Sequence, residues 1–116
     1  MIETDTKQYN LEARTFEFAK KVRLFVKSLA KTIANIEDGK QLIRSSGSVG
    51  ANYIEANESF SKKDFFMRIK ICRKEAKESR YWLQLLDVKS DECENLIKEA
   101  SELTNIFGAI VRNAKI

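Results

Sequence analysis

Apolar residues recur at alternating spacings of three and four along most of this chain, which is the repeat of an amphipathic α-helix. Four such segments follow one another, and short polar stretches with capping or turn residues separate them. No stretch alternates apolar and polar residues as a half-buried strand would. The pattern predicts helices over residues 15–35, 40–59, 62–87 and 91–114.

Each predicted helix carries an apolar stripe that can face a shared core, and the stripe of the third helix is the most regular. In chain order, the four stripes consist of Ala19, Val22, Val26, Leu29, Ile33 and Ile36; Leu42, Ser46, Val49, Tyr53, Ala56 and Phe60; Phe65, Ile69, Cys72, Ala76, Ser79, Leu83 and Leu86; and Leu96, Ala100, Leu103, Phe107, Ile110 and Ala114. Short connections make successive helices antiparallel neighbours, so we expect an all-α, up-down-up-down four-helix bundle.

The ends of the predicted helices carry recognisable signals. Thr15 is placed to cap the first helix, Ser61 to cap the third and Asp91 to cap the fourth. The first helix should stop before the Glu-Asp-Gly sequence at 37–39. Residues 1–14 show no sustained period, so we interpret them as an N-terminal arm that precedes a bundle over 15–116.

The second helix contains two glycines, Gly47 and Gly50, although each costs roughly 1 kcal/mol relative to alanine inside a helix. The expected gain is close approach by a neighbouring helix. The opposite face of this helix is polar and includes Arg44, Asn52 and Glu55. We expect a structural role for these three residues, with partners on another helix or another subunit.

Three segments resemble one known family: RSSGSVGANYIEA at 44–56, SKKDF at 61–65 and KEAKESRYWLQLL at 74–86. The chain is similar to the four helix bundle protein family, whose members are also called 23S ribosomal RNA intervening-sequence proteins. Some of them are encoded inside insertions in bacterial 23S rRNA genes. The resemblance runs from about residue 16 to 115, and it departs from the family pattern where Gly47 lies one position later than the family's glycine.

The resemblance implies an antiparallel bundle that assembles into a ring-like homopentamer and has a poorly defined cellular role. A related protein is the accessory protein of diversity-generating retroelements, which works with a reverse transcriptase and RNA. The partners that the resemblance implies are therefore further copies of the chain and RNA or another nucleic acid.

Composition agrees with a single helical domain. The 116 residues include no proline and only four glycines, and a third of them are charged. No apolar run approaches the ~20 residues that a membrane span needs, and the N-terminal residues lack the apolar core of a signal peptide. We therefore expect a cytoplasmic protein with no membrane partner.

The side chains that usually carry catalysis are scarce. The chain has no histidine, which removes the commonest general base and transition-metal ligand. Cys72 and Cys93 are too few for a thiolate zinc site, and a hairpin of the third and fourth helices would hold them too far apart for a disulfide. Glutamate pairs at helical spacing are usually solvated surface pairs. We expect a non-enzyme with no catalytic residues, no metal, no cofactor and no small-molecule substrate.

Charge is distributed unevenly along the chain. Residues 15–36 hold five basic residues and one acidic residue, a net +4, and residues 62–80 hold eight and three, a net +5. Residues 87–107 hold two basic and six acidic residues, a net −4. The candidate nucleic-acid-binding residues are the cations on the expected outer faces, which can neutralise phosphates: Lys20, Lys21, Lys27, Lys70, Arg73, Lys74, Lys77 and Arg80.

A plainer interpretation is that these charges solvate the bundle and pair with the acidic fourth helix, and we favour it over nucleic-acid binding by roughly two to one. Tyr81 is the one aromatic residue expected on the basic face. Lysines there can follow phosphates but cannot distinguish bases.

The third helix also carries a second apolar set: Met67, Ile71, Trp82 and Leu85. A single core needs only one apolar face from each helix, so this set predicts an oligomer interface. Two hypotheses of function remain. One is a self-assembling helical scaffold that binds RNA or a ribonucleoprotein through its basic surface, and the other is a protein–protein adaptor with no nucleic-acid binding.

Overall fold

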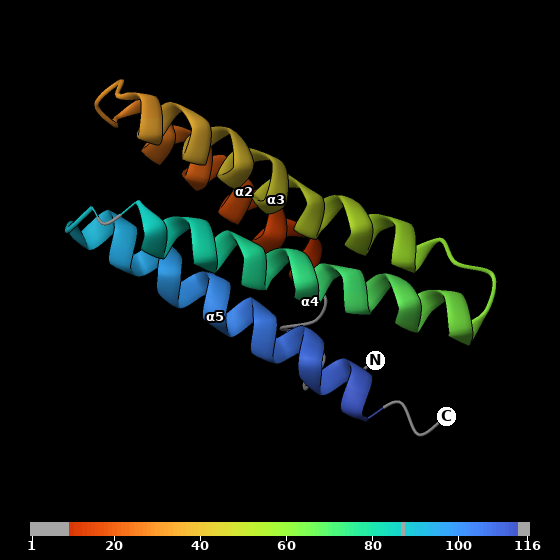
Figure 1. Cartoon of the computed structure of the whole chain (residues 1–116). Coiled ribbons are helices and arrows are strands. Elements are labelled where there is room, and N and C mark those ends of the chain that lie inside the picture. The colour runs from red at the N-terminus through yellow and green to blue at the C-terminus, as the bar shows by residue number, and fades with distance from the viewer. Residues whose placement is uncertain (1–9, 87, 114–116) are drawn as a thin grey trace.

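The computed structural model describes residues 10–86 and 88–113, which form four α-helices: α2 (Leu11–Lys27), α3 (Ile33–Asn57), α4 (Lys62–Leu85) and α5 (Asp91–Arg112). Successive helices run antiparallel, and the α3–α4 turn lies at the opposite end from the α2–α3 turn (Figure 1). Each helix packs beside two neighbours, α2 also meeting α5, and the backbones of diagonal helices stay apart within the described residues. The predicted all-α four-helix bundle is confirmed.

The predicted boundary between the first two helices is wrong. Helix α2 ends at Lys27, and α3 begins at Ile33 after Thr32, whose side chain accepts a hydrogen bond from the Asn35 N–H at 3.1 Å. The cap at Thr32 competes with continuation of the first helix. Ile33 and Ile36, which we assigned to the core stripe of the first helix, are 84% and 44% exposed on α3.

Gly39 lies inside α3 rather than at a turn. It is buried against α2, where a Cβ on Gly39 would lie 3.1 Å from Cγ1 of Val26. This glycine therefore allows close helix packing. The sequence pattern suggested a helix break at this position, because glycine is common at turns as well as at close backbone contacts.

The start of the first helix also differs from the prediction. Residues 1–9 of the predicted arm lie outside the described residues, whereas Leu11 begins α2 and is completely buried. Thr15 is not a cap, because its hydroxyl donates to the carbonyl oxygen of Leu11 at 2.7 Å inside the helix. The apolar stripe of α2 thus starts one turn earlier, at Leu11.

The remaining helix ends are closer to expectation. Ser61 caps α4 as predicted, accepting from the Asp64 N–H at 3.1 Å. Helix α5 is capped by Ser90 rather than by Asp91. Helix α3 stops at Asn57, so Phe60, which we placed in a core stripe, lies beyond the helix and is fully exposed.

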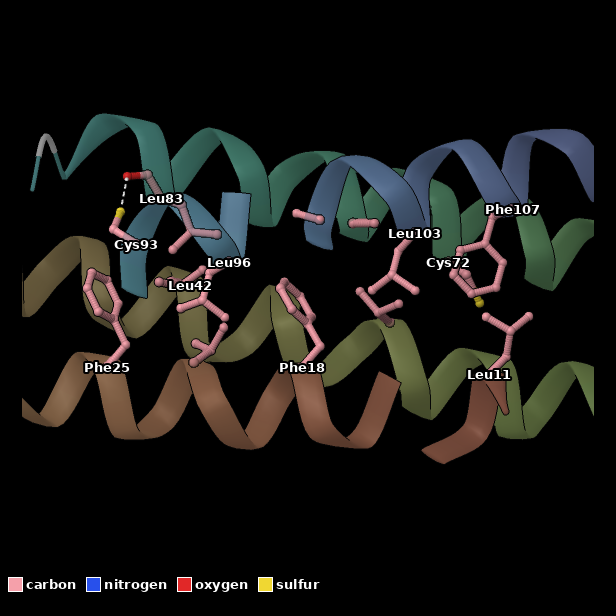
Figure 2. Packing of buried hydrophobic residues seen from close by; sticks show 14 of the residues in the cluster. Leu11, Phe18, Phe25, Leu42, Cys72, Leu83, Cys93, Leu96, Leu103 and Phe107 are labelled. Carbon is pink, nitrogen blue, oxygen red and sulfur yellow. Dashed lines mark hydrogen bonds between the residues drawn. The ribbon is translucent and has the colours of Figure 1, made fainter. Parts of the chain in front are cut away.

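The core runs along the axis of the bundle. In Figure 2, buried side chains of α2 point toward buried side chains of α5: Leu11, Phe18 and Phe25, and Leu96, Leu103 and Phe107. The two cysteines are free thiols at opposite ends of the core shown in Figure 2, and the Cys93 thiol lies 3.7 Å from the Leu83 carbonyl oxygen. Burial raises the pKa of Cys72 to about 12, so it stays a protonated, unreactive thiol at neutral pH.

Candidate nucleic-acid interface

Helix α4 turns a lysine-rich face to the outside. Its core stripe, which includes Ile69 and Ala76, is buried against the other helices. The residues on the opposite side are exposed and lie at helical spacing. We call four of them the α4 basic face: Lys63, Lys70, Lys74 and Lys77.

The eight candidate residues do not gather in one place. Lys20, Lys21 and Lys27 are exposed on α2, which lies diagonal to α4 in the bundle. The outer faces of diagonal helices point away from each other. The α2 lysines are therefore on the opposite corner of the bundle from the α4 basic face.

The acidic helix α5 directs its paired carboxylates toward α2. Arg14 of α2 bonds to Glu99 at 2.7 Å and to Glu102 at 2.6 Å. The hydrogen bond that Arg14 donates to the Glu99 carboxylate is the main cause that raises the pKa of Arg14. The α4 basic face forms no salt bridge within the described residues, so acidic α5 does not pair with it.

Two arginines lie along the seam between α4 and α5. Arg80 is half-buried and donates to the Ser101 hydroxyl at 3.3 Å. Arg73 lies two turns before Arg80 in α4, and its side chain lies over Gly108, which is two turns after Ser101 in α5. Arg112 reaches the same glycine, and the sequence analysis missed it, although an antiparallel hairpin register would have placed it there.

The polar face of α3 is tied to α4. The Arg44 guanidinium pairs with Glu78 and, at 3.5 Å, with Glu75. The indole N–H of Trp82 donates to the same Glu78 carboxylate at 3.0 Å. Buried hydroxyls continue this seam, since Ser45 Oγ and Ser79 Oγ are 3.0 Å apart.

The other motif residues on α3 have simpler surroundings. Asn52 accepts from Arg68 of α4 at 3.0 Å. Glu55 is exposed, and its carboxylate has no salt bridge among the described residues. A Cβ on Gly47 would lie 3.4 Å from the Arg23 guanidinium, and one on Gly50 would lie 2.9 Å from Thr15 Oγ1. The two glycines thus face α2.

A family model described as 23S rRNA-intervening sequence protein matches residues 7–109. The chain belongs to this family. It is also similar to a crystal structure of a protein of unknown function from the S23 ribosomal protein family of Bacteroides thetaiotaomicron. That match has 27% identity and a TM-score of 0.78, and it covers 89% of this chain and 99% of the other. A comparison with curated proteins gave no match.

The second apolar set of this family member divides between core and surface. Met67 and Leu85 are 55% and 49% exposed, whereas Ile71 and Trp82 are half-buried, Trp82 against the core. The set therefore belongs partly to the core and partly to the surface of the bundle.

Exposed apolar side chains also occur where we did not expect them. Phe16 and Ile54 line an apolar groove of about 680 Å³ between α2 and α3. The helical period could have revealed Phe16, which lies off the core stripe of α2.

The described residues hold no group of three or more histidine, cysteine, aspartate or glutamate side chains that could bind a metal ion. No helix in that part of the chain is both long and apolar enough to cross a membrane.

Proposed function

We propose that this member of the 23S rRNA-intervening sequence protein family is a non-enzymatic, self-assembling helical bundle that binds RNA through the α4 basic face. The observation that carries the proposal is that the lysines of that face take no part in the salt bridges of the described residues, although Lys74 is close enough to the Glu78 carboxylate to help lower its pKa. Glu99 and Glu102 of acidic α5 bind Arg14 on another side of the bundle.

The chemistry of the α4 basic face favours the phosphate backbone over the bases. Lys70, Lys74 and Lys77 follow one another at about 5 to 6 Å per step, which is comparable to the spacing of phosphates along a strand. An ammonium group is a point charge that neutralises a phosphate without selecting a base. Within α4, Tyr81 offers the one exposed ring among the described residues, which provides little stacking. We expect weak sequence preference and steep salt dependence.

Self-assembly is the second part of the proposal. Met67 and Leu85 expose apolar surface on the same helix as the basic face, and a second copy of the chain is the occupant we propose for it. The family resemblance favours a cyclic homopentamer. A ring would repeat the weak lysine footprint and raise its affinity through multivalency.

RNA binding is tested by fluorescence anisotropy with two unrelated RNA oligonucleotides across a salt series. We expect the triple variant Lys70→Gln, Lys74→Gln, Lys77→Gln to bind both RNAs more weakly. The slope of log affinity against log salt concentration should fall by the equivalent of about three phosphate contacts. The matched control neutralises Lys20, Lys21 and Lys27 on the opposite corner and should change the slope less. Absence of RNA binding by wild type at low salt would instead favour the adaptor hypothesis.

Assembly is tested by light scattering at micromolar concentration. A mass larger than a monomer is expected for wild type, and the double variant Met67→Lys, Leu85→Lys should lower it. The pair Phe16→Lys, Ile54→Lys is the matched comparison at the α2–α3 groove. If only this second pair lowers the mass, the interface on α4 is wrong while self-assembly stands; a monomeric wild type overturns self-assembly.

A further inference from the structure

Gly108 of α5 lies beneath two guanidinium groups from different helices. A Cβ at this glycine would lie 3.1 Å from Nε of Arg73 and 3.4 Å from a terminal nitrogen of Arg112. Both arginines therefore approach one point on the surface of the bundle. The space around that point is a cleft of about 480 Å³, lined by Lys70, Arg73, Gly108, Val111 and Arg112. We call this cleft the Gly108 notch.

Among the described residues, no carboxylate forms a salt bridge with the cations of the Gly108 notch. Within the described residues, Lys70, Arg73 and Arg112 form neither a salt bridge nor a side-chain hydrogen bond. Arg44 of α3, which packs on the other side of α4, provides a contrast, because its guanidinium pairs with the carboxylates of Glu75 and Glu78. Like charges that converge without a counter-charge repel one another, and a bound anion would remove that repulsion.

The shape and chemistry of the notch suit a phosphoryl group. Guanidinium groups present planar forks of N–H donors that bind phosphate oxygens in pairs, and an ammonium group adds a third positive charge. The missing side chain at Gly108 lets both arginine side chains lie directly against the α5 backbone, on the floor of the cleft. Lys74 and Lys77, by contrast, lie outside this cleft.

We infer that the Gly108 notch is a phosphate-binding site that takes one phosphoryl group of a nucleic-acid chain, with Arg73 and Arg112 as bidentate donors and Lys70 beside them. This inference rests on the proposed function and deepens it. The notch anchors one phosphate in a defined position, and the neighbouring lysines neutralise those that follow.

Gly108→Ala separates shape from charge. The added methyl group would occupy space beside the Arg73 side chain without changing the net charge, and alanine favours the helix. Gly47→Ala is the matched control, since Gly47 also lies in a helix below a guanidinium, but below that of Arg23 alone. Arg112→Gln removes one donor at the exposed end of α5.

The first measurement is calorimetric titration of the full chain with inorganic pyrophosphate at constant ionic strength. We expect Gly108→Ala and Arg112→Gln each to weaken binding roughly tenfold, which corresponds to the loss of a charge-assisted hydrogen bond. Gly47→Ala should bind like wild type. Equal affinities for wild type, Gly108→Ala and Arg112→Gln would overturn the site, as would failure of wild type to bind pyrophosphate.

The second measurement compares one RNA oligonucleotide with a 5′-phosphate and with a 5′-hydroxyl. A loss of affinity in Gly108→Ala for both forms assigns the notch to a backbone phosphodiester, and a loss for the phosphorylated form alone assigns it to a chain end. If RNA affinity depends on Lys74 and Lys77 but not on Gly108 or Arg112, the proposed function stands and the notch inference fails. If wild type binds pyrophosphate through the notch but binds no RNA, the phosphate site stands, whereas its nucleic-acid ligand and the proposed function fail.

Discussion

Helix α4 meets a neighbour on each side, and the two seams use charge in opposite ways. Toward α3, Arg44 is matched by Glu75 and Glu78, and the buried hydroxyls of Ser45 and Ser79 are in contact. Toward α5, Arg73 converges with a second arginine over Gly108 and meets no carboxylate in the described residues. We call the α3–α4 seam, whose charges and hydroxyls are paired with one another, the closed seam. We call the α4–α5 seam, which leaves charge exposed to solvent, the open seam.

This difference distinguishes structural cations from available ones. Exposed salt bridges contribute little to stability, with a median near 0 to 1 kcal/mol. The absence of partners for Arg73 therefore costs the fold little and leaves the guanidinium free to bind an anion. Arg44, with two carboxylates already bound, is a poor candidate for phosphate recognition. Net charge along the sequence does not separate these two arginines.

The largest expected effect comes from overpacking the closed seam. Ser79 is completely buried, and its hydroxyl bonds to the Glu75 carbonyl oxygen at 2.9 Å and to Ser45. We expect Ser79→Leu to lower the free energy of unfolding by about 3 kcal/mol, because the added carbons have no space and the hydroxyl contact is lost. Chemical denaturation followed by circular dichroism measures this change.

The control is Ser101→Leu on the open seam. Ser101 is half-buried beneath Arg80, whose long side chain can move aside. A loss below about 1 kcal/mol is expected there. Equal losses for the two leucine variants would mean that the seams are packed alike, and the comparison would fail.

A smaller effect compares two glycines. A Cβ at Gly50 would meet Thr15 Oγ1 at 2.9 Å and Thr15 Cβ at 3.3 Å, and hydrogen bonds to Leu11 and Glu12 carbonyls hold that threonine in place. We expect Gly50→Ala to destabilise by about 1 kcal/mol net, since overpacking exceeds the gain in helix propensity.

Gly108→Ala should have the opposite sign. Its methyl group meets the side chain of Arg73, which can move into solvent, so the gain in helix propensity of up to about 1 kcal/mol should remain. Denaturation of both variants under identical conditions checks the signs. Destabilisation by Gly108→Ala would show that Arg73 is fixed in the seam.

The fold could be predicted because the apolar spacing that defines each helix is local and repeats along the chain. The stripe of α4 places Ile69, Cys72, Ala76 and Leu83 in the core, as its spacing requires. The α2–α3 turn could not be predicted, because the apolar period continues through Ile33 and Ile36 while Thr32 caps a new helix. Periodicity alone cannot distinguish one long helix from two helices that meet at a cap.

The candidate site was only partly accessible from sequence, for a different physical reason. Helical spacing is sufficient to place Lys70, Lys74 and Lys77 on one outer face. The Gly108 notch depends on the register between α4 and α5, which brings Arg112 near Arg73 although the two lie far apart in sequence. Register is a property of the packed pair, so neither helix reveals it alone.

The smallest expected effect is a pH dependence at the closed seam. Burial raises the pKa of Glu78, but hydrogen bonds from Trp82 and Arg44 and the charges of Arg44 and Lys74 outweigh it, so the net shift is downward from 4.5. A carboxyl group with a lowered pKa stabilises the fold above its unfolded pKa and loses that contribution as the pH falls through its folded value. We expect Glu78→Gln to cost less than about 1 kcal/mol at pH 7 and progressively less below pH ~4.5.

Glu55→Gln, at an exposed glutamate of α3, should show no such pH dependence. Urea denaturation at pH 7 and at pH ~3.5 measures both variants against wild type. If the stability difference between wild type and Glu78→Gln stays constant or widens on acidification, the ionised Glu78 carboxylate does not stabilise the seam, and the contrast between paired and unpaired arginines loses its energetic basis.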